Sequence, residues 1–420
     1  MFKERVKGHH RPNLSKPTMV NPKELEDFLN TKPDSKDGII YFHVPFCDNI
    51  CSFCNLNRKK LDGKLDEYSD FLVQNIKYYA KFPYIKDKVF KSIYFGGGTP
   101  TTLSLSNLER VLKAINESFN IAKEAEFSFE TTLHNLNKNK INLMQSLGVN
   151  RYSIGIQTFS NKGRKLLNRV GDKSKALEKL GLIKDEFSGF VCTDIIYNYP
   201  NQSQDEILED ARILKELKID STSFYSLQFH EGSAFLKEND PNYYDLKTDF
   251  KLHKLFLESM LDDSDYELLE YTKVARKNRD RYLYIKLSHE GVDILPIGVG
   301  AGGGLGNFGI FSMSQEMKMI SKKTAAQKEY DLFSNLFQYD KIDIARVKSF
   351  LDDKTFDEIY RFFKACESEK LLKIEEGFLI FNIAGIFWGN SIAEESLNLT
   401  KEYFLQKHLK EIEGENLWKH

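Results

Sequence analysis

Short apolar segments alternate with longer amphipathic segments from Gly38 to about Leu227. The short segments are rich in Ile, Val, Phe and Tyr, and the longer ones repeat apolar residues at helical spacing. This alternation predicts parallel β/α units. The strands that we expect are Ile39 to Val44, Ser92 to Phe95, Glu126 to Glu130, Tyr152 to Gln157, Phe190 to Ile196 and Ser221 to Leu227. Such an α/β fold forms either a barrel or an open doubly wound sheet, and in both the chemistry collects at the carboxyl ends of the strands.

The pattern changes on both sides of these units, which we assign to residues 38–231. Residues 1–37 contain three prolines in a short span and are expected to form an irregular N-terminal arm. Residues 232–325 show a helical pattern, one strand from Val292 to Ile297 and a glycine-dense loop, and we expect them to extend the barrel towards a substrate or second cofactor. Residues 326–420 begin with two or three helices and continue with a hairpin that turns at Gly377, which predicts a small winged-helix-like α+β domain.

Composition narrows the class of protein. Hydrophobic residues make up 41% of the 420 residues and charged residues 29%, which is typical of a globular protein. The net charge of -1 gives no overall basic field for nucleic acid or anionic lipid. The longest apolar stretch, Phe378 to Trp388, is too short to span a bilayer and contains Asn382, and no apolar signal core follows Met1. We therefore expect a cytoplasmic protein with no membrane or nucleic-acid partner.

Three of the five cysteines lie within eight positions, directly after the first expected strand. Cys47, Cys51 and Cys54 are therefore expected on one loop at the mouth of the barrel. A structural zinc site normally requires four ligands, and the nearest candidate for the fourth is His43. Three thiolates suit a 4Fe-4S cluster with one iron left open, because thiolates are the usual cluster ligands. A cluster is the main hypothesis, and a zinc site and ordinary core thiols are its alternatives.

These motifs resemble those of radical S-adenosylmethionine (SAM) enzymes. The resemblance rests on Tyr41-Phe-His-Val-Pro-Phe-Cys47-x3-Cys51-x2-Cys54 and on Tyr94-Phe-Gly-Gly-Gly-Thr-Pro100, and it extends from about Ile39 into the C-terminal part. It implies a partial (β/α)6 barrel, a 4Fe-4S cluster whose open iron chelates the methionine moiety of SAM, and a 5'-deoxyadenosyl radical. Within the superfamily the chain is similar to the branch that contains oxygen-independent coproporphyrinogen III oxidase, the heme chaperone and the heme-utilisation proteins.

The resemblance also implies a set of SAM-binding residues. The glycine loop would hold the methionine end, polar side chains at the strand ends would hold the adenosyl group and the methionine carboxylate, and two aromatic rings would lie near the adenine and the cluster. The set comprises Tyr41, Phe53, Gly97, Gly98, Thr99, Glu130, Gln157, Arg169, Asp194 and Ser226. A structural ion pair between Glu130 and Arg169 is an alternative, and either aromatic ring can also be part of the core.

Two further stretches are candidates for the substrate side. Gly298-Val-Gly300-Ala-Gly302-Gly303 has the spacing of a dinucleotide fingerprint, but more glycines follow where that motif needs a helix. The family resemblance instead implies that Gly302 and Gly303 lie near a second SAM or a tetrapyrrole. Arginines and phenols suit the propionates and the rings of a tetrapyrrole, although a charged run can also be a solvated surface. The candidates are Arg279, Arg281, Tyr282 and Tyr284, with His230 and His289 as possible iron ligands or proton donors.

Three functions compete within this branch. The decarboxylase motif carries another cysteine two positions beyond the third, where this chain has Asn55-Leu56. The heme chaperones carry a His-Asn-x-x-Tyr-Trp element, where this chain has Asn278 to Leu283. The stretch from Arg281 to Tyr284 and the later glycines resemble the heme-utilisation proteins and anaerobilin synthase. We therefore expect a methyltransferase that uses two SAM molecules, opens heme to a linear tetrapyrrole and takes electrons from a flavodoxin or a ferredoxin.

Overall fold

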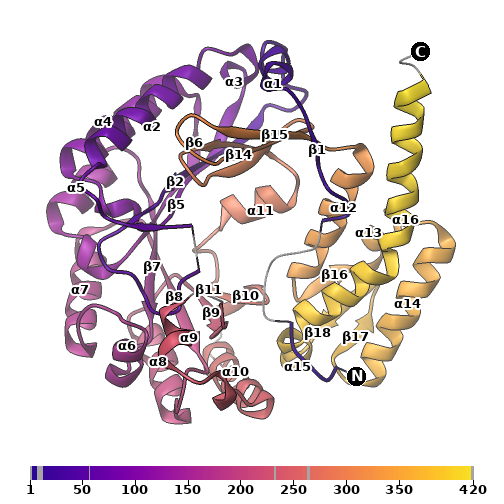
Figure 1. The fold of residues 1–420 in the computed structure, drawn as a ribbon. Helices are drawn as coiled ribbons and strands as arrows, with labels where there is room; N and C mark the ends of the chain where they lie inside the picture. The colour runs from indigo at the N-terminus through magenta and orange to yellow at the C-terminus, as the bar shows by residue number, and fades with distance from the viewer. Residues whose placement is uncertain (1, 7–12, 56, 231–232, 263–264, 418–420) are drawn as a thin grey trace.

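The computed structural model describes residues 2–6, 13–55, 57–230, 233–262 and 265–417, and its centre is a sheet of 13 strands (Figure 1). The strand order is β1-β15-β14-β13-β12-β2-β5-β6-β7-β8-β9-β11-β10. The six expected strands are confirmed, and they pair in parallel in the order of the sequence. They are β2 (Asp37–Val44), β5 (Val89–Gly97), β6 (Ile121–Thr131), β7 (Arg151–Gln157), β8 (Phe190–Tyr197) and β9 (Ser221–Ser226). A seventh, β12 (Asp293–Ile297), pairs in parallel with the other side of β2.

The crossover helices cover the convex face of this curved sheet (Figure 1). Alternation within each strand explains the arrangement, because Ile40, Phe42 and Val44 enter the main apolar core while Tyr41 lines an inner cavity. The helices are α2 (Leu65–Tyr79), α4 (Leu105–Ser118), α5 (Lys138–Ser146), α6 (Asn161–Leu166), α7 (Lys173–Glu186) and α8 (Gln204–Glu216). The partial barrel is therefore confirmed over the doubly wound sheet, whose crossover helices would cover both faces.

Antiparallel strands extend the sheet at both edges, and these strands were not expected. The glycine-dense stretch, expected to be a loop, forms β13 (Gly302–Leu305) and β14 (Phe308–Ser312), which continue into β15 (Lys318–Lys322). At the other edge β11 (Lys273–Arg276) pairs with β9, and β10 (Tyr266–Glu270) pairs with β11. Backbone pairing with neighbouring strands overrides the low strand propensity of glycine here.

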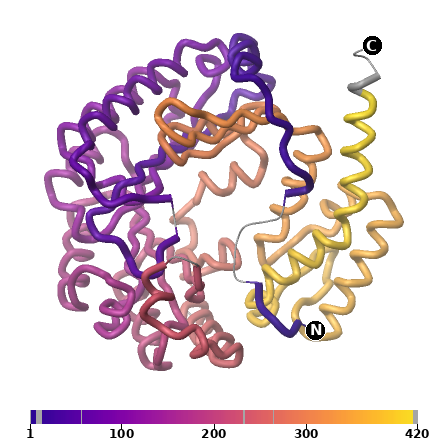
Figure 2. Tube along the Cα trace, in the orientation of Figure 1, coloured from indigo at the N-terminus to yellow at the C-terminus, as the bar shows by residue number. Residues whose placement is uncertain are grey.

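The N-terminal residues are more regular than an irregular arm. Strand β1 (Thr18–Met19) pairs with β15, and α1 (Pro22–Leu29) begins with a capping box formed by Asn21 and Glu24. Strands from the expected segments 1–37, 38–231 and 232–325 thus share one sheet. Figure 2 shows the start of the chain beside the C-terminal part, where Arg5 Nε donates to the carbonyl of Phe387 at 2.9 Å.

The C-terminal part has its own small sheet, of order β16-β18-β17. The expected hairpin is confirmed, since β17 (Leu372–Glu375) and β18 (Phe378–Phe381) join at Glu376 and Gly377, both with positive φ. The other elements are α12 (Ala325–Asn335), β16 (Lys341–Asp343), α13 (Ile344–Lys348), α14 (Asp353–Ser368), α15 (Ile383–Phe387) and α16 (Gly389–Leu417). Within the described residues no helix combines the length and the apolar character that crossing a membrane requires.

Candidate active site

A cavity of about 700 Å³ lies at the carboxyl ends of the parallel strands. Most of the residues proposed from the sequence meet there. Those that line it are Tyr41, Cys47, Cys51, Phe53, Cys54, Gly97, Gly98, Thr99, Glu130, Gln157, Arg169, Asp194, Tyr282 and Tyr284. The expectation that chemistry collects at this end of the barrel therefore agrees with the geometry.

The three cysteines of the loop face this cavity with different exposure. Cys47 is buried in the short strand β3 (Phe46–Cys47), whereas Cys51 and Cys54 are half-buried. Thr99 Oγ1 lies 3.6 Å from Cys47 Sγ, and Arg169 Nη1 lies 2.8 Å from Cys51 Sγ. Burial raises the pKa of Cys47, and the hydrogen bond from Thr99 opposes this rise. The three sulfur atoms share one loop beside the cavity, so the loop suits ligation by sulfur.

His43 does not supply a fourth ligand for zinc. Its Nε2 lies 2.9 Å from the carbonyl oxygen of Asn57 and its Nδ1 lies 3.1 Å from Tyr41 Oη. Burial lowers the pKa of His43, which favours a neutral ring held by these two bonds. Among the described residues no three His, Cys, Asp or Glu side chains are close enough together to hold one metal ion. A four-iron cluster separates its thiolates more widely than one ion does, so this spacing counts against zinc but not against a cluster.

The glycine loop at the end of β5 packs directly against the cysteine loop. Gly98 N donates to the carbonyl of Val44 at 2.8 Å, and Thr99 N donates to the carbonyl of Phe46 at 2.7 Å. A Cβ on Gly98 would lie 2.6 Å from the Phe46 carbonyl oxygen, and Gly97 has a φ of 114°. Only glycine fits such contacts without a shift of the backbone, so these residues fix the loop beside the cavity.

Two partly buried acids also line the cavity. Glu130 accepts hydrogen bonds from Tyr94 Oη at 2.9 Å and from Gly97 N at 3.1 Å, and burial raises its pKa to about 7. Burial also raises the pKa of Asp194, against the opposing effects of Lys273 and of a hydrogen bond with Ser223. The expected alternative, an ion pair between Glu130 and Arg169, is not formed, because Arg169 instead contacts Cys51 Sγ and the carbonyl of Gly155.

Several features of this site fit a polar ligand. Gln157, at the end of β7, has a φ of 72°, a strained value for a residue other than glycine. Arg169 Nε is buried without a hydrogen-bond partner in the described residues, and so is Ser226 Oγ at the end of β9. Ser226 itself is not among the residues that line the cavity. Buried polar atoms without partners are costly, so the Arg169 guanidinium is suited to a bound acceptor.

Stacked tyrosines form one wall of the cavity. The ring centroids of Tyr94 and Tyr284 are 4.5 Å apart, those of Tyr41 and Tyr284 are 5.8 Å apart, and both pairs are stacked. Tyr284 belongs to α11 (Leu283–His289), which lies on the concave side of the sheet (Figure 1). This wall offers a flat aromatic surface to an adenine or to a tetrapyrrole.

Sequence reasoning missed Lys273 on the floor of the cavity. Lys273 is buried in β11, its Nζ lies 3.2 Å from Ser223 Oγ, and it sits 4.5 Å from the centre of the Tyr282 ring. A lysine within a short apolar strand was the available signal, but the strand itself was not expected. Arg58 also lines the cavity and was not proposed.

Arg279 and Arg281 lie away from this cavity, which corrects their assignment to the substrate side. Arg279 Nε donates to Asp220, just before β9, at 2.7 Å, and Arg281 donates to the carbonyl of Glu124, in the first half of β6, at 2.8 Å. Both contacts are near the amino ends of the strands. Between the two arginines, Asp280 is buried and turns into the barrel, so the charged run is neither a substrate clamp nor wholly a solvated surface.

Four other candidates also lie outside the cavity. His230 Nδ1 is 3.1 Å from Asn55 Nδ2, and His289 Nδ1 is 3.0 Å from Tyr339 Oη. Gly302 and Gly303 belong to β13 and are not among the residues that line the cavity. Leu56, which enters the comparison with the decarboxylase motif, is outside the described residues.

Comparison with known proteins agrees with this geometry. Residues 41–214 match the family model described as the Radical SAM superfamily. The chain is 27% identical over 287 residues to anaerobilin synthase of Escherichia coli O157:H7. The matched segment covers 67% of this chain and 64% of that protein. It is 30% identical over 202 residues to the heme chaperone HemW of Lactococcus lactis, which covers 48% of this chain and 52% of that protein. The matched parts span less than two thirds of either relative.

A solved structure shares the fold across most of the chain. Coproporphyrinogen III oxidase (HemN) from Escherichia coli superposes with a TM-score of 0.74, covering 88% of this chain and 92% of that one. The two are 19% identical, so the likeness concerns the fold. The partial barrel and its extensions are therefore a known architecture.

Proposed function

We propose that the chain opens heme to a linear tetrapyrrole with one added methyl group and releases the iron, using the part that matches the Radical SAM superfamily, residues 41–214. One observation carries this proposal: the cysteine loop, the polar strand ends and the stacked tyrosines Tyr41, Tyr94 and Tyr284 line the same cavity. The similarity to anaerobilin synthase over 67% of the chain supports heme as the substrate.

The residues present fit a cluster and SAM. Cys47, Cys51 and Cys54 would hold the cluster, and the glycine loop would carry the methionine end of SAM. Arg169, whose Nε has no partner in the described residues, would bind the methionine carboxylate, and Asp194 would bind the adenosyl group. When bound, the cluster supplies an electron to SAM, and SAM supplies a carbon radical and a methyl group.

The side chains of the cavity orient the reactants and exclude water. Tyr41, Tyr94 and Tyr284 stack on one another and form a rigid aromatic wall, which limits the ways in which a flat conjugated ring can enter. Lys273 holds an ammonium group at the buried floor, where it offsets the charge of Asp194. Buried walls of this kind protect a reactive carbon radical from side reactions.

The test is one anaerobic incubation of iron-loaded protein with heme, SAM and titanium(III) citrate, read by mass spectrometry. Loss of the Soret band with an open tetrapyrrole as product supports the proposal. Intact heme that moves to an added apo-cytochrome indicates a heme chaperone instead. A parallel incubation with coproporphyrinogen III that releases carbon dioxide indicates a decarboxylase, and would also show that Asn55-Leu56 does not exclude that activity.

A further inference from the structure

Exposed apolar side chains gather on one part of the sheet. Five of the large apolar residues that stay more than two fifths exposed lie on β1, on β14 and β15, or in the turn between β14 and β15. They are Met19 (52%), Phe311 (42%), Met313 (48%), Met317 (52%) and Met319 (41%), and we call them the methionine face. Four of the seven methionines in the chain belong to this face. A contiguous exposed apolar patch marks a place of interaction, and methionine is common on surfaces that bind apolar ligands.

Strand register places three of these residues on the same side of the sheet. Phe311 pairs with Met319, and Met313 N donates to the carbonyl of Met317. Met19 pairs with Ser321, two residues beyond Met319. Directly opposite residues share a face and residues two apart share a face, so Met19, Phe311 and Met319 lie on one side of the sheet. Met313 and Met317 close the turn at the end of this surface, and Met317 also lines the hollow on the other side of β15.

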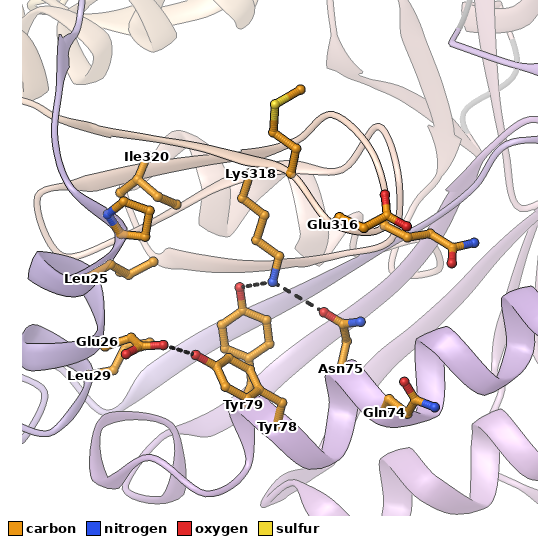
Figure 3. Close-up of a pocket in the computed structure, with 13 residues that line it drawn as sticks. Leu25, Glu26, Leu29, Gln74, Asn75, Tyr78, Tyr79, Glu316, Lys318 and Ile320 are labelled. Atoms are coloured by element: carbon orange, nitrogen blue, oxygen red, sulfur yellow. Dashed lines mark hydrogen bonds between the residues drawn. The ribbon is translucent and has the colours of Figure 1, made fainter.

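The opposite side of β15 is anchored to the helices of the convex face. Figure 3 shows Lys318 and Ile320 pointing into a hollow between β15, α1 and α2. Lys318 Nζ donates to Asn75 Oδ1 at 3.3 Å and to Tyr79 Oη at 3.0 Å. Met319, between Lys318 and Ile320, therefore points to the concave side.

The methionine face continues the wall of the candidate active site. Tyr41 on β2 pairs with Pro296 on β12, two residues after Ile294, which pairs with Gly304 on β13. Gly304 pairs in turn with Gly309, two residues before Phe311. The surface from Tyr41 to Phe311 is thus one face of one sheet. Gly304 and Gly309 have no side chains, so nothing projects from the sheet at these two positions.

Size and charge indicate what this surface holds. The cavity of about 700 Å³ has the size of a pocket for one drug-sized ligand, whereas the proposed reaction needs a cluster, SAM and a heme. Most of the macrocycle must then lie outside it. Arg58 lines this cavity and also an adjoining hollow of about 300 Å³, which is lined by Lys59 and Met313 as well. The hollow sets Arg58 and Lys59 at the edge of the apolar surface, and Glu316 lines it too. Arg58 Nη2 donates to the carbonyl of Cys54 at 2.6 Å, and Lys59 Nζ lies 3.3 Å from Asp62 in an exposed ion pair, which a propionate would replace.

We propose that the methionine face binds the apolar macrocycle of heme, with the propionates at Arg58 and Lys59 and the reacting edge in the cavity. This inference rests on the proposed function. Thioether and phenyl groups pack against a flat apolar ring, and guanidinium and ammonium groups pair with carboxylates. The face thereby selects a large, flat, dianionic ligand.

The experiment is a heme titration under anaerobic conditions without SAM, followed by the Soret band. The double variant Met317→Gln, Met319→Gln should bind heme at least about tenfold more weakly than the wild type. Leu105→Gln is the matched control, since Leu105 is 39% exposed at the start of α4 and lies outside the face. Urea unfolding checks that each variant stays folded. Substitutions at exposed positions usually change the free energy of unfolding little, so we expect both variants to fold.

Charge is tested separately with Lys59→Gln and with heme dimethyl ester, which lacks the carboxylates. We expect Lys59→Gln to weaken binding of heme but not of the ester. Equal effects on both ligands would contradict the assignment of the propionates.

The outcomes separate this inference from the proposed function. If the double variant binds and opens heme like the wild type, the methionine face is not the heme site, and the proposed function stands. If the wild type neither binds nor opens heme, both fail. If light scattering shows a wild-type dimer that the double variant loses while heme binding is unchanged, the face is an interface between two copies and the inference is overturned.

Discussion

At the scale of single residues, Cys51 lies at the junction of the cysteine loop and the β7–β8 region. Its Sγ is 2.8 Å from Arg169 Nη1, which itself follows the end of α6. This contact fixes the position of the Cys51 sulfur beside the cavity that both residues line.

We predict that Cys51→Ala abolishes cluster loading, because two thiolates do not hold a cluster that leaves one iron open. The wild type should contain about four irons per chain after anaerobic reconstitution. Cys366→Ala is the control, since Cys366 is buried in α14, far from the loop in the sequence. Full iron content in Cys51→Ala, by iron analysis and absorption spectra, would rule out the loop as the cluster site.

Asp194→Asn should weaken binding of SAM while iron content and fold stay unchanged. The loss of a hydrogen bond to a charged group costs about 1.5 to 3 kcal/mol, or roughly ten- to a hundredfold in affinity. Asp210→Asn is the control, because Asp210 is also a carboxylate at least half-buried within the barrel region but accepts its bond from Thr158, outside the cavity. Calorimetry measures the affinity for SAM of each protein. Equal affinities in the wild type and Asp194→Asn would show that Asp194 does not bind SAM.

Glu130 predicts a pH dependence of stability. Burial raises its pKa from 4.5 to about 7 in the folded state. A carboxyl with a raised folded pKa stabilises the fold below the unfolded pKa, and this contribution disappears as pH rises through the folded value. The wild type should therefore lose on the order of 3 kcal/mol between about pH 4.5 and 7 from this group.

Glu130→Gln should reduce that loss, since an amide does not titrate. Urea unfolding at several pH values measures the difference between the two proteins. Glu270 and Asp210 also have pKa values raised to about 7 by burial, so part of the pH dependence should remain in the variant. An unchanged slope in Glu130→Gln would show that Glu130 does not titrate in this range.

At the scale of elements, an ion pair joins the barrel to the segment that precedes α11. Arg151 Nε and Nη2 donate to the two carboxylate oxygens of Asp280 at 2.9 and 3.0 Å, and both side chains are fully buried. The same segment carries Tyr282 into the cavity, and α11, which follows it directly, carries Tyr284. The pair thus positions the aromatic wall.

Asp280→Asn should destabilise the fold by about 3 to 5 kcal/mol, because it removes the nearer counter-charge of the buried Arg151 guanidinium and leaves only Glu126, at 4.0 Å. Arg212→Ala breaks an exposed pair with Glu216 and should change stability by less than about 1 kcal/mol. Urea unfolding compares the two. A loss in Asp280→Asn as small as in Arg212→Ala would show that the buried pair does not hold this segment.

The parallel strands could be predicted from the sequence because their apolar runs are long and regular. The edge strands could not, since β13 consists of three glycines and a leucine, and β11 begins with the buried Lys273. Both strands form because a neighbouring strand pairs with them, and their own pattern of apolar and polar residues does not predict a strand. The cysteine spacing and the strand ends predicted most of the residues that line the cavity. The assignment of Arg279 and Arg281 to the substrate side does not agree with the cavity, because a charged run does not indicate at which end of the barrel it lies.

At the scale of the whole molecule, the sheet connects three surfaces into one path. The cysteine loop, the stacked tyrosines and the methionine face all lie on the concave side or at its carboxyl edge. The N-terminal residues close the arrangement, as Arg5 pairs with the buried Asp249 at 3.0 Å and also contacts the C-terminal part. A heme that rests on one surface can present its edge to the chemistry of another.

The most direct test of this account is the fate of the methyl group of SAM. Iron-loaded protein, heme, titanium(III) citrate and SAM with a deuterated methyl group are incubated without oxygen, and the tetrapyrrole is analysed by mass spectrometry. The account predicts an open, iron-free tetrapyrrole that carries the deuterium label, and its loss in Cys51→Ala. Recovery of intact, unlabelled heme from protein with a full cluster would contradict it.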